Sequence, residues 1–398
     1  MYSTMKPWQR VLKGLKEKNP TLYWIARFML SDLGKMIDKL TRVNRVGYLA
    51  RLANEVKWDE QRFSKNINKL ASLGFGFTTH FWLHRIGLME YFIFVDEFID
   101  FNNILPKIRS WIRSYARTFS PKGTIIVLYM PYNYADLLSY ITKKWLKENY
   151  SDNIIAFLAI DLVLQPSFTR YKFDEHPLYR GYKYSELERI FNNADEEFPE
   201  NIIDNYRLKR EVSYPTDIID LLIMKELEKD GLTTLRDIST AYGYDMGRLR
   251  DHLDEHIIEN GLVKGIYLKR LIYVKAFGSP LLLLLKIRGE KLYTKWINFF
   301  AKLENTLFIE YSPFKSKKYY LYIGLTYSLG GLNSVKTFIA NSLDEGFLED
   351  IIAMDYIPSS VRKFTVPYKN YLQDKRQWDI DVDKTHMLFE RRILRKRE

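Results

Sequence analysis

The sequence predicts an α+β protein of two tandem units, each a winged helix-turn-helix followed by a ferredoxin-like βαββαβ sheet. Three observations predict it: an internal repeat, a three-helix pattern with a wing, and an alternation of strands and helices that occurs twice. The chain has 398 residues, enough for about two to four domains. Its 46% apolar and 15% aromatic residues can fill real cores, which excludes wholesale disorder.

The repeat has a spacing of 186 residues. Val46–Asp59 aligns without gaps on Leu232–Asp245, so that Trp58-Asp59 matches Tyr244-Asp245. A second echo matches residues 165–170 with residues 357–362. Apolar positions are kept more often than identities, which indicates a repeated pattern and a tandem duplication.

The helix-turn-helix pattern is clearest in the second unit. Apolar residues recur at helical spacing after Pro215, and Gly231 ends that helix. A short helix is expected from Thr234 to about Ala241, and Asp245 is expected to N-cap a third helix that ends at Asn260-Gly261. The extended stretch at 263–274 then predicts a wing.

Strands and helices alternate as βαββαβ after each wing. In the second unit the expected elements are strand 281–287, helix 291–303, strand 306–311, strand 319–327, helix 332–343 and strand 347–356. In the first unit they are strand 91–97, helix 104–114, strand 115–120, strand 124–130, helix 134–147 and strand 154–164.

These patterns divide the chain into seven segments. They are a basic N-terminal segment 1–30, winged helix 31–88, ferredoxin-like domain 89–165, helical connector 166–214, winged helix 215–275, ferredoxin-like domain 276–357 and C-terminal extension 358–398 with a basic tail.

This order resembles the leucine-responsive and asparagine-operon regulator family (Lrp/AsnC), whose members join a helix-turn-helix to a ferredoxin-like ligand-sensing (RAM) domain. The resemblance is best over residues 216–231 and 256–265. It implies a transcriptional regulator, and two copies would resemble a covalent pseudo-dimer. The length, the divergent first copy and the extra segments depart from the family pattern, and no effector pocket transfers residue by residue.

Charge is spread unevenly along the chain. The net charge is +12, and residues 1–165 hold 24 basic against 14 acidic side chains, whereas residues 166–398 hold 37 against 35. A basic half favours a polyanionic partner. The third helix of the first unit is the candidate DNA-recognition helix. Arg and Lys side chains can pair with phosphates or guanine edges, and Gln and Asn side chains can pair with adenine edges. The candidate nucleic-acid-binding residues, including phosphate contacts on flanking elements, are Arg42, Arg45, Arg51, Lys57, Gln61, Arg62, Ser64, Lys65, Asn68 and Lys69.

The second unit lacks this basic face. At the same spacing Lys65 is replaced by Asp251 and Lys69 by Glu255, and carboxylates repel phosphate. His252-Leu-Asp-Glu255-His256 matches the short inverted zincin pattern H-x-x-E-H. Because no further ligand stands out nearby, we expect these two histidines to be packed or solvated and not to bind a metal. No catalytic residue, metal site or cofactor is expected.

The leading hypothesis is therefore a DNA-binding transcriptional regulator or chromatin-associated protein that binds duplex DNA and lacks catalysis. The alternatives are an RNA- or ribosome-associated factor and a protein-interaction scaffold. A homodimer through the ferredoxin-like sheets is possible on this reading. The absence of cysteine, of a signal peptide and of an apolar run long enough for a membrane span indicates a cytoplasmic protein, with a composition typical of thermophiles.

Overall fold

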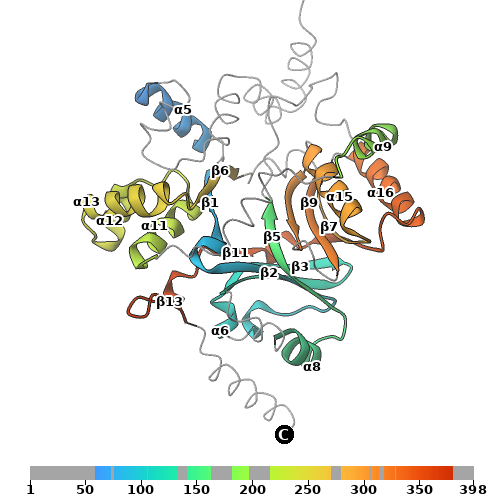
Figure 1. Ribbon diagram of the computed structural model, residues 1–398, viewed down its shortest axis with the longest axis horizontal. Coiled ribbons are helices and arrows are strands. Elements are labelled where there is room, and N and C mark those ends of the chain that lie inside the picture. The colour runs from blue at the N-terminus through green and yellow to red at the C-terminus, as the bar shows by residue number, and fades with distance from the viewer. Residues whose placement is uncertain are drawn as a thin grey trace, which may run out of the picture.

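The computed structural model shows a mixed α/β protein built around a large antiparallel sheet (Figure 1). It describes residues 59–72, 76–104, 106–131, 141–162, 182–196, 216–269, 279–303, 306–312, 318–327 and 329–379. Among these residues no helix is long and apolar enough to cross a membrane.

The central sheet takes strands from both halves of the chain. They are β2 (Leu88–Val95), β3 (Ile112–Ser120), β4 (Gly123–Pro131), β5 (Ile154–Leu162), β7 (Ser279–Ile287), β8 (Thr306–Tyr311), β9 (Tyr319–Tyr327), β10 (Asp350–Tyr356) and β11 (Arg362–Lys363). Their order is β10-β7-β9-β8-β5-β2-β4-β3-β11, and β10 also pairs with β3. This extra pairing joins one end of the sheet to the other, so eight of the strands close into a barrel-like ring.

The inside of the ring is apolar. Each half contributes four strands in the order fourth, first, third, second: β5-β2-β4-β3 and β10-β7-β9-β8. Aromatic and aliphatic side chains from both halves meet between them, and the ring of Phe92 lies 4.5 Å from that of Tyr322. Burial of this shared core holds the two halves together.

Helices cover the outer face of the second half. They are α9 (Tyr184–Asn192), α15 (Glu290–Lys302) and α16 (Leu329–Asp344). Trp296 of α15 is fully buried and lies 4.7 Å from Phe191 of α9, measured between ring centroids. The segment 166–214 was expected as a helical connector, and its described part contributes α9 to this core. Just after α9, Asp195 Oδ2 accepts a hydrogen bond from Lys302 Nζ of α15.

A helical module packs against the first half. It comprises α11 (Ile218–Lys229), α12 (Leu235–Tyr242), α13 (Met246–Asp251) and the π-helix η5 (His252–Glu259), followed by β6 (Val263–Lys269). Strand β1 (Gly76–Phe81), which follows α5 (Glu60–Ser72), pairs antiparallel with β6. The module shares one core with the outer face of β2 and β4, where α6 (Pro106–Arg109), η4 (Ile141–Leu146) and α8 (Lys147–Asn149) also lie.

The C-terminal extension is structural as far as residue 379. After β11 it forms a hairpin of β12 (Tyr371–Leu372) and β13 (Gln377–Trp378). Trp378 is buried, and its Nε1 donates to the Ile86 carbonyl at 2.7 Å. The segment therefore folds back over the first half of the chain. The basic segment 1–30 and the tail Arg391–Arg397 lie outside the described residues.

The helix expected at 104–114 is wrong in its length and its end. The structure has only α6 there, and strand β3 begins at Ile112. Pairing with β4, which includes a bulge between Ile112 and Ser114, overrides the helical spacing of Ile104, Ile108 and Trp111.

Candidate metal centre

The site begins at the N-terminus of α11, where two aspartates cap the helix. The Asp217 carboxylate accepts hydrogen bonds from the amides of Ile219 and Asp220, and Asp220 Oδ2 accepts one from the Asp217 amide. This reciprocal capping box satisfies donors that would otherwise be orphaned at a helix start. It also fixes both carboxylates in one orientation.

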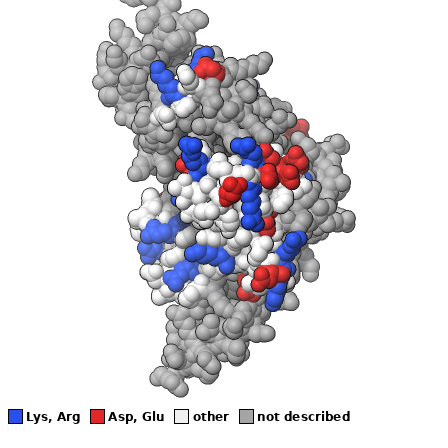
Figure 2. All heavy atoms as spheres, turned by 90° about the vertical axis from the view of Figure 1, so that its left-hand side faces the viewer, with Lys and Arg blue, Asp and Glu red and all other residues white. Residues whose placement is uncertain are grey.

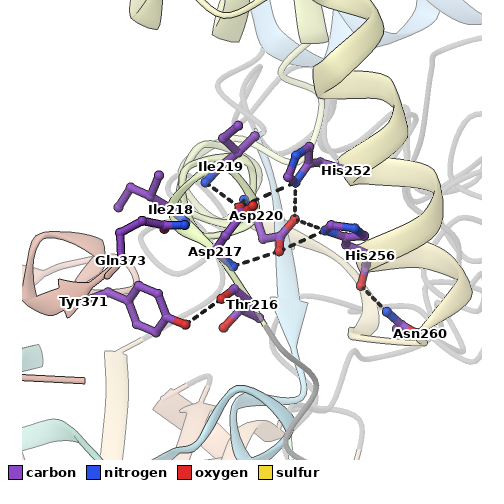
Figure 3. A network of polar contacts seen from close by, with 10 residues as sticks. All are labelled: Thr216, Asp217, Ile218, Ile219, Asp220, His252, His256, Asn260, Tyr371 and Gln373. Carbon is purple, nitrogen blue, oxygen red and sulfur yellow. Dashed lines mark hydrogen bonds and ion pairs between the residues drawn. The ribbon is translucent and has the colours of Figure 1, made fainter. Parts of the chain in front are cut away.

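Asp220 faces inward and meets two histidines of the third helix. It is fully buried, and its Oδ1 lies 2.8 Å from His252 Nδ1 and 3.1 Å from His256 Nδ1 (Figure 3). Asp217 Oδ1 lies 3.5 Å from His252 Nδ1. One nitrogen from each imidazole and one oxygen from each carboxylate lie within 4.8 Å of one another.

The third helix changes its winding at this point. It starts as α13 with Asp245 as its N-cap, as expected from the sequence, and becomes the π-helix η5 at His252. The two imidazoles lie 4.5 Å apart between ring centroids and both aim their Nδ1 at α11. Single π turns inside α-helices are frequent at functional sites.

The site is buried on one side and open on the other. The side chain of His252 is 11% exposed, whereas that of His256 is 42% exposed. Burial raises the pKa of the Asp220 carboxyl above its ordinary value, although the hydrogen bond to His252 acts in the opposite direction. A cation placed against Asp220 would therefore offset the cost of burying its charge.

The C-terminal hairpin holds the same helix end. The Tyr371 hydroxyl donates to the Thr216 carbonyl at 2.5 Å, and the Ile218 amide donates to Gln373 Oε1 at 2.8 Å. Both partners adjoin Asp217 in the chain (Figure 3). The backbone that presents the aspartates is thus fixed from outside the helical module as well as from within it.

Two imidazole nitrogens and two carboxylate oxygens form a donor set typical of zinc and similar first-row cations. At metal–ligand distances of about 2.0–2.1 Å, neighbouring ligands of a tetrahedral ion lie about 3.3 Å apart. The contacts of 2.8 to 3.5 Å around His252 are close to that spacing. Without an ion, the imidazole N–H groups would donate to Asp220 and join the third helix to α11.

The residues expected to bind nucleic acid fall into two groups. Arg42, Arg45, Arg51 and Lys57 lie outside the described residues. The others lie on α5, where Gln61, Arg62, Lys65 and Asn68 are exposed and Ser64 is half-buried; Lys69 belongs to the helix, but its side chain is not described. None of the described members of this set contributes to the cluster on α11 and η5. On the described part of the face that carries the helical module of α11, α12 and α13, Lys and Arg side chains are interspersed with Asp and Glu (Figure 2).

Sequence reasoning noticed His252 and His256 but missed their partners. The aspartates precede His252 by more than 30 positions, and nothing in H-x-x-E-H points to them. Glu255, the acidic residue specified by that motif, is exposed. A usable signal was the pair Asp217-x-x-Asp220 at a helix start, with the second carboxylate on the apolar side of α11.

No protein-family model and no curated protein matches the chain. Among solved structures, the siroheme decarboxylase NirDL is similar with a TM-score of 0.49 at 11% identity, over 84% of this chain and 92% of that one. Its complex with an iron-uroporphyrin III analogue gives a TM-score of 0.46 at 12% identity over the same shares. PH0061 gives a TM-score of 0.23 at 18% identity, over 32% of this chain and 87% of that one.

These comparisons correct the functional expectation. The reading as a tandem Lrp/AsnC-like transcriptional regulator is wrong, because the solved chains that match over most of this chain are described as an enzyme. The RNA-associated factor and the interaction scaffold fit that finding no better. The physical reason is that the quoted patterns, apolar spacing and helix caps, specify how elements pack and not what an exposed face binds.

Proposed function

We propose that this protein binds a divalent transition metal ion of the zinc type between α11 and η5. The observation that carries the proposal is the convergence of His252, His256, Asp220 and Asp217 on one point, with a ligand atom of each within 4.8 Å of the others. In the sequence, only the short H-x-x-E-H pattern pointed to a metal, and no metal site was expected.

Three features of the cluster support the proposal. Three separations between ligand atoms, at 2.8, 3.1 and 3.5 Å, are close to the spacing of about 3.3 Å in a tetrahedral site. Asp220 is completely buried and is held in place by the capping box, which serves as a supporting shell. The partial exposure of His256 gives an ion a path from solvent.

Metal titration of the full chain tests the proposal. After removal of metals with a chelator and dialysis, we expect zinc to bind at one ion per chain and to raise the melting temperature, because an ion that binds only the folded state stabilises it. His256→Ala should weaken zinc binding at least about tenfold, the usual minimum for loss of a ligand or its support. Acidification should also weaken it, since protons compete for imidazole nitrogen.

Glu255→Gln is the matched control, because Glu255 lies on the same helix next to His256 and is exposed. It should bind zinc as the wild type does. Zinc binding that is absent in the wild type, or unchanged in both His256→Ala and Asp220→Asn, would overturn the proposal. The cluster would then be a hydrogen-bonded helix junction.

We also propose that the chain consists of two tandem winged-helix and ferredoxin-like units with the boundaries 31–88, 89–165, 215–275 and 276–357. The repeated strand order in the two halves of the ring supports this proposal. So does the pairing of β1 with β6, the strands expected in the two wings. A solved structure in which residues 31–58 do not form two helices packed on α5 would contradict it.

A further inference from the structure

The ring of strands opens to solvent at one end through a cavity of about 650 Å³. Its wall comes from the end of β2, the β3–β4 turn, the start of β5 and the middle of β10. The residues are Phe94, Asp96, Pro121, Asp152, Asn153, Ile154, Ile155, Ile351, Ile352 and Ala353. The cavity lies far from α11 in the chain and shares no residue with the metal cluster.

The inner wall is apolar and continues the core of the ring. Phe94 is buried, and Ile155 and Ile352 are half-buried where they pack against that core. These side chains come from both halves of the chain. An apolar guest that covered Ile155 and Ile352 would remove from water surface that the fold leaves half exposed. The volume lies within the range of small-molecule sites, which often occupy the mouths of barrels.

The rim carries a carboxylate whose described partners are neutral. Asp96 accepts hydrogen bonds from the Ser151 hydroxyl and from Asn153 Nδ2, the latter at 2.7 Å. Both donors are uncharged, so they orient the carboxylate without neutralising it. In the part of the chain that the structure describes, Asp96 makes no ion pair.

The neighbouring lysines at this end form ion pairs with acidic side chains other than Asp96. Lys147 Nζ lies 3.1 Å from Asp152, and Lys122 Nζ lies 2.5 Å from Glu97. Once these pairs are formed, the negative charge of Asp96 remains at the edge of an apolar cavity. A cationic group beside Asp96 would gain a charge-assisted hydrogen bond there.

We propose that this cavity binds a small amphipathic primary amine. Its hydrocarbon part packs against Phe94, Ile155 and Ile352, and its ammonium group pairs with Asp96. The geometry separates the two requirements, because the apolar wall lies inside the mouth and the charge lies at the rim. A neutral or anionic molecule of the same shape would satisfy only the first.

Isothermal titration of the full chain with three matched probes tests the proposal. The probes are cyclohexylmethylamine, cyclohexylmethanol and cyclohexanecarboxylate, which share a ring and differ in charge. We expect the amine to bind at least about tenfold more tightly than the alcohol, the worth of one charge-assisted contact, and the carboxylate to bind least. The titrations are run with a chelator present, so that failure of the metal proposal leaves this result unaffected.

Two variants assign the site. Asp96→Asn should remove the preference for the amine over the alcohol, and Ile352→Trp should fill the cavity and weaken both. Asp152→Asn is the matched control, because Asp152 already pairs with Lys147, and it should keep the preference. Melting curves check that each variant is folded. Equal binding of amine and alcohol by the wild type, no binding of any probe, or amine binding unaffected by Ile352→Trp would overturn the proposal.

Discussion

The helices α5 and α13 with η5 match at the 186-residue spacing, but the side chains at their matched positions make different contacts. Asn66 of α5 donates its Nδ2 hydrogen to the Arg62 carbonyl of its own helix at 2.8 Å. The matching residue is His252, which instead contacts the buried Asp220 of another helix. At the matched position, Asn66 therefore contacts the backbone of its own helix, whereas His252 contacts a side chain of another helix.

The rest of the cluster follows the same division. At the matched spacing, Asp217, Asp220, His252 and His256 correspond to Ser31, Gly34, Asn66 and Leu70, so none of the four ligand residues recurs there. The difference teaches that two helices with matching apolar spacing can carry polar side chains with quite different contacts. Among the residues that the structure describes, the candidate metal centre lies on α11 and η5.

The largest expected effect comes from removing the centre of that junction. Asp220→Ala should destabilise the protein by about 3 kcal/mol, because it leaves two inward-facing imidazoles and a capping amide without their acceptor. Urea denaturation of the metal-free protein measures this loss. The matched change Asn66→Ala should cost less than about 0.5 kcal/mol, since that side chain bonds only its own helix. Equal losses would show that the two copies do not differ as described.

Much of the fold was predictable from the sequence, and the reason is that local patterns specified it. Strands 306–311 and 319–327 have the expected bounds, and Thr234 and Asp245 cap the expected helices. Closure of the ring was not predictable, because it depends on the contact between Tyr356 and Thr118, which are more than 200 residues apart. The site was only half predictable for the same reason: His252 and His256 share a helix, but their partner Asp220 belongs to another.

A second polar group distinguishes the two copies and responds to pH. Lys225 Nζ and the Tyr242 hydroxyl both donate to Glu226 Oε1. Burial alone would raise the pKa of Glu226, but these contacts outweigh it and lower that pKa. At the matched spacing the first copy has Leu40 and Val56 in place of Glu226 and Tyr242.

Because the folded pKa of Glu226 is below the unfolded value of about 4.3, its ionised form stabilises the protein above that pH. The stabilisation is lost as the pH falls through the folded pKa. Glu226→Gln should therefore cost about 1.5 kcal/mol at pH 7, and the difference from wild type should shrink toward pH 3. Urea midpoints across this range measure it. A constant difference at all pH values would mean that Glu226 acts through packing and not through its charge.

The smallest expected difference lies where the copies have stayed alike. Asp59 accepts a hydrogen bond from the Arg62 amide at 2.8 Å, and Asp245 accepts one from the matching Arg248 amide at 3.0 Å. Both carboxylates cap the start of the third helix, so Asp59→Ala and Asp245→Ala should each cost about 1 kcal/mol, the usual worth of an N-cap. Asp→Asn at either position retains the acceptor and should cost clearly less. Thermal melts of the four variants measure these effects. A loss at Asp245 several times that at Asp59 would show that the cap of the second copy also supports the junction at His252, seven residues further along the same helix.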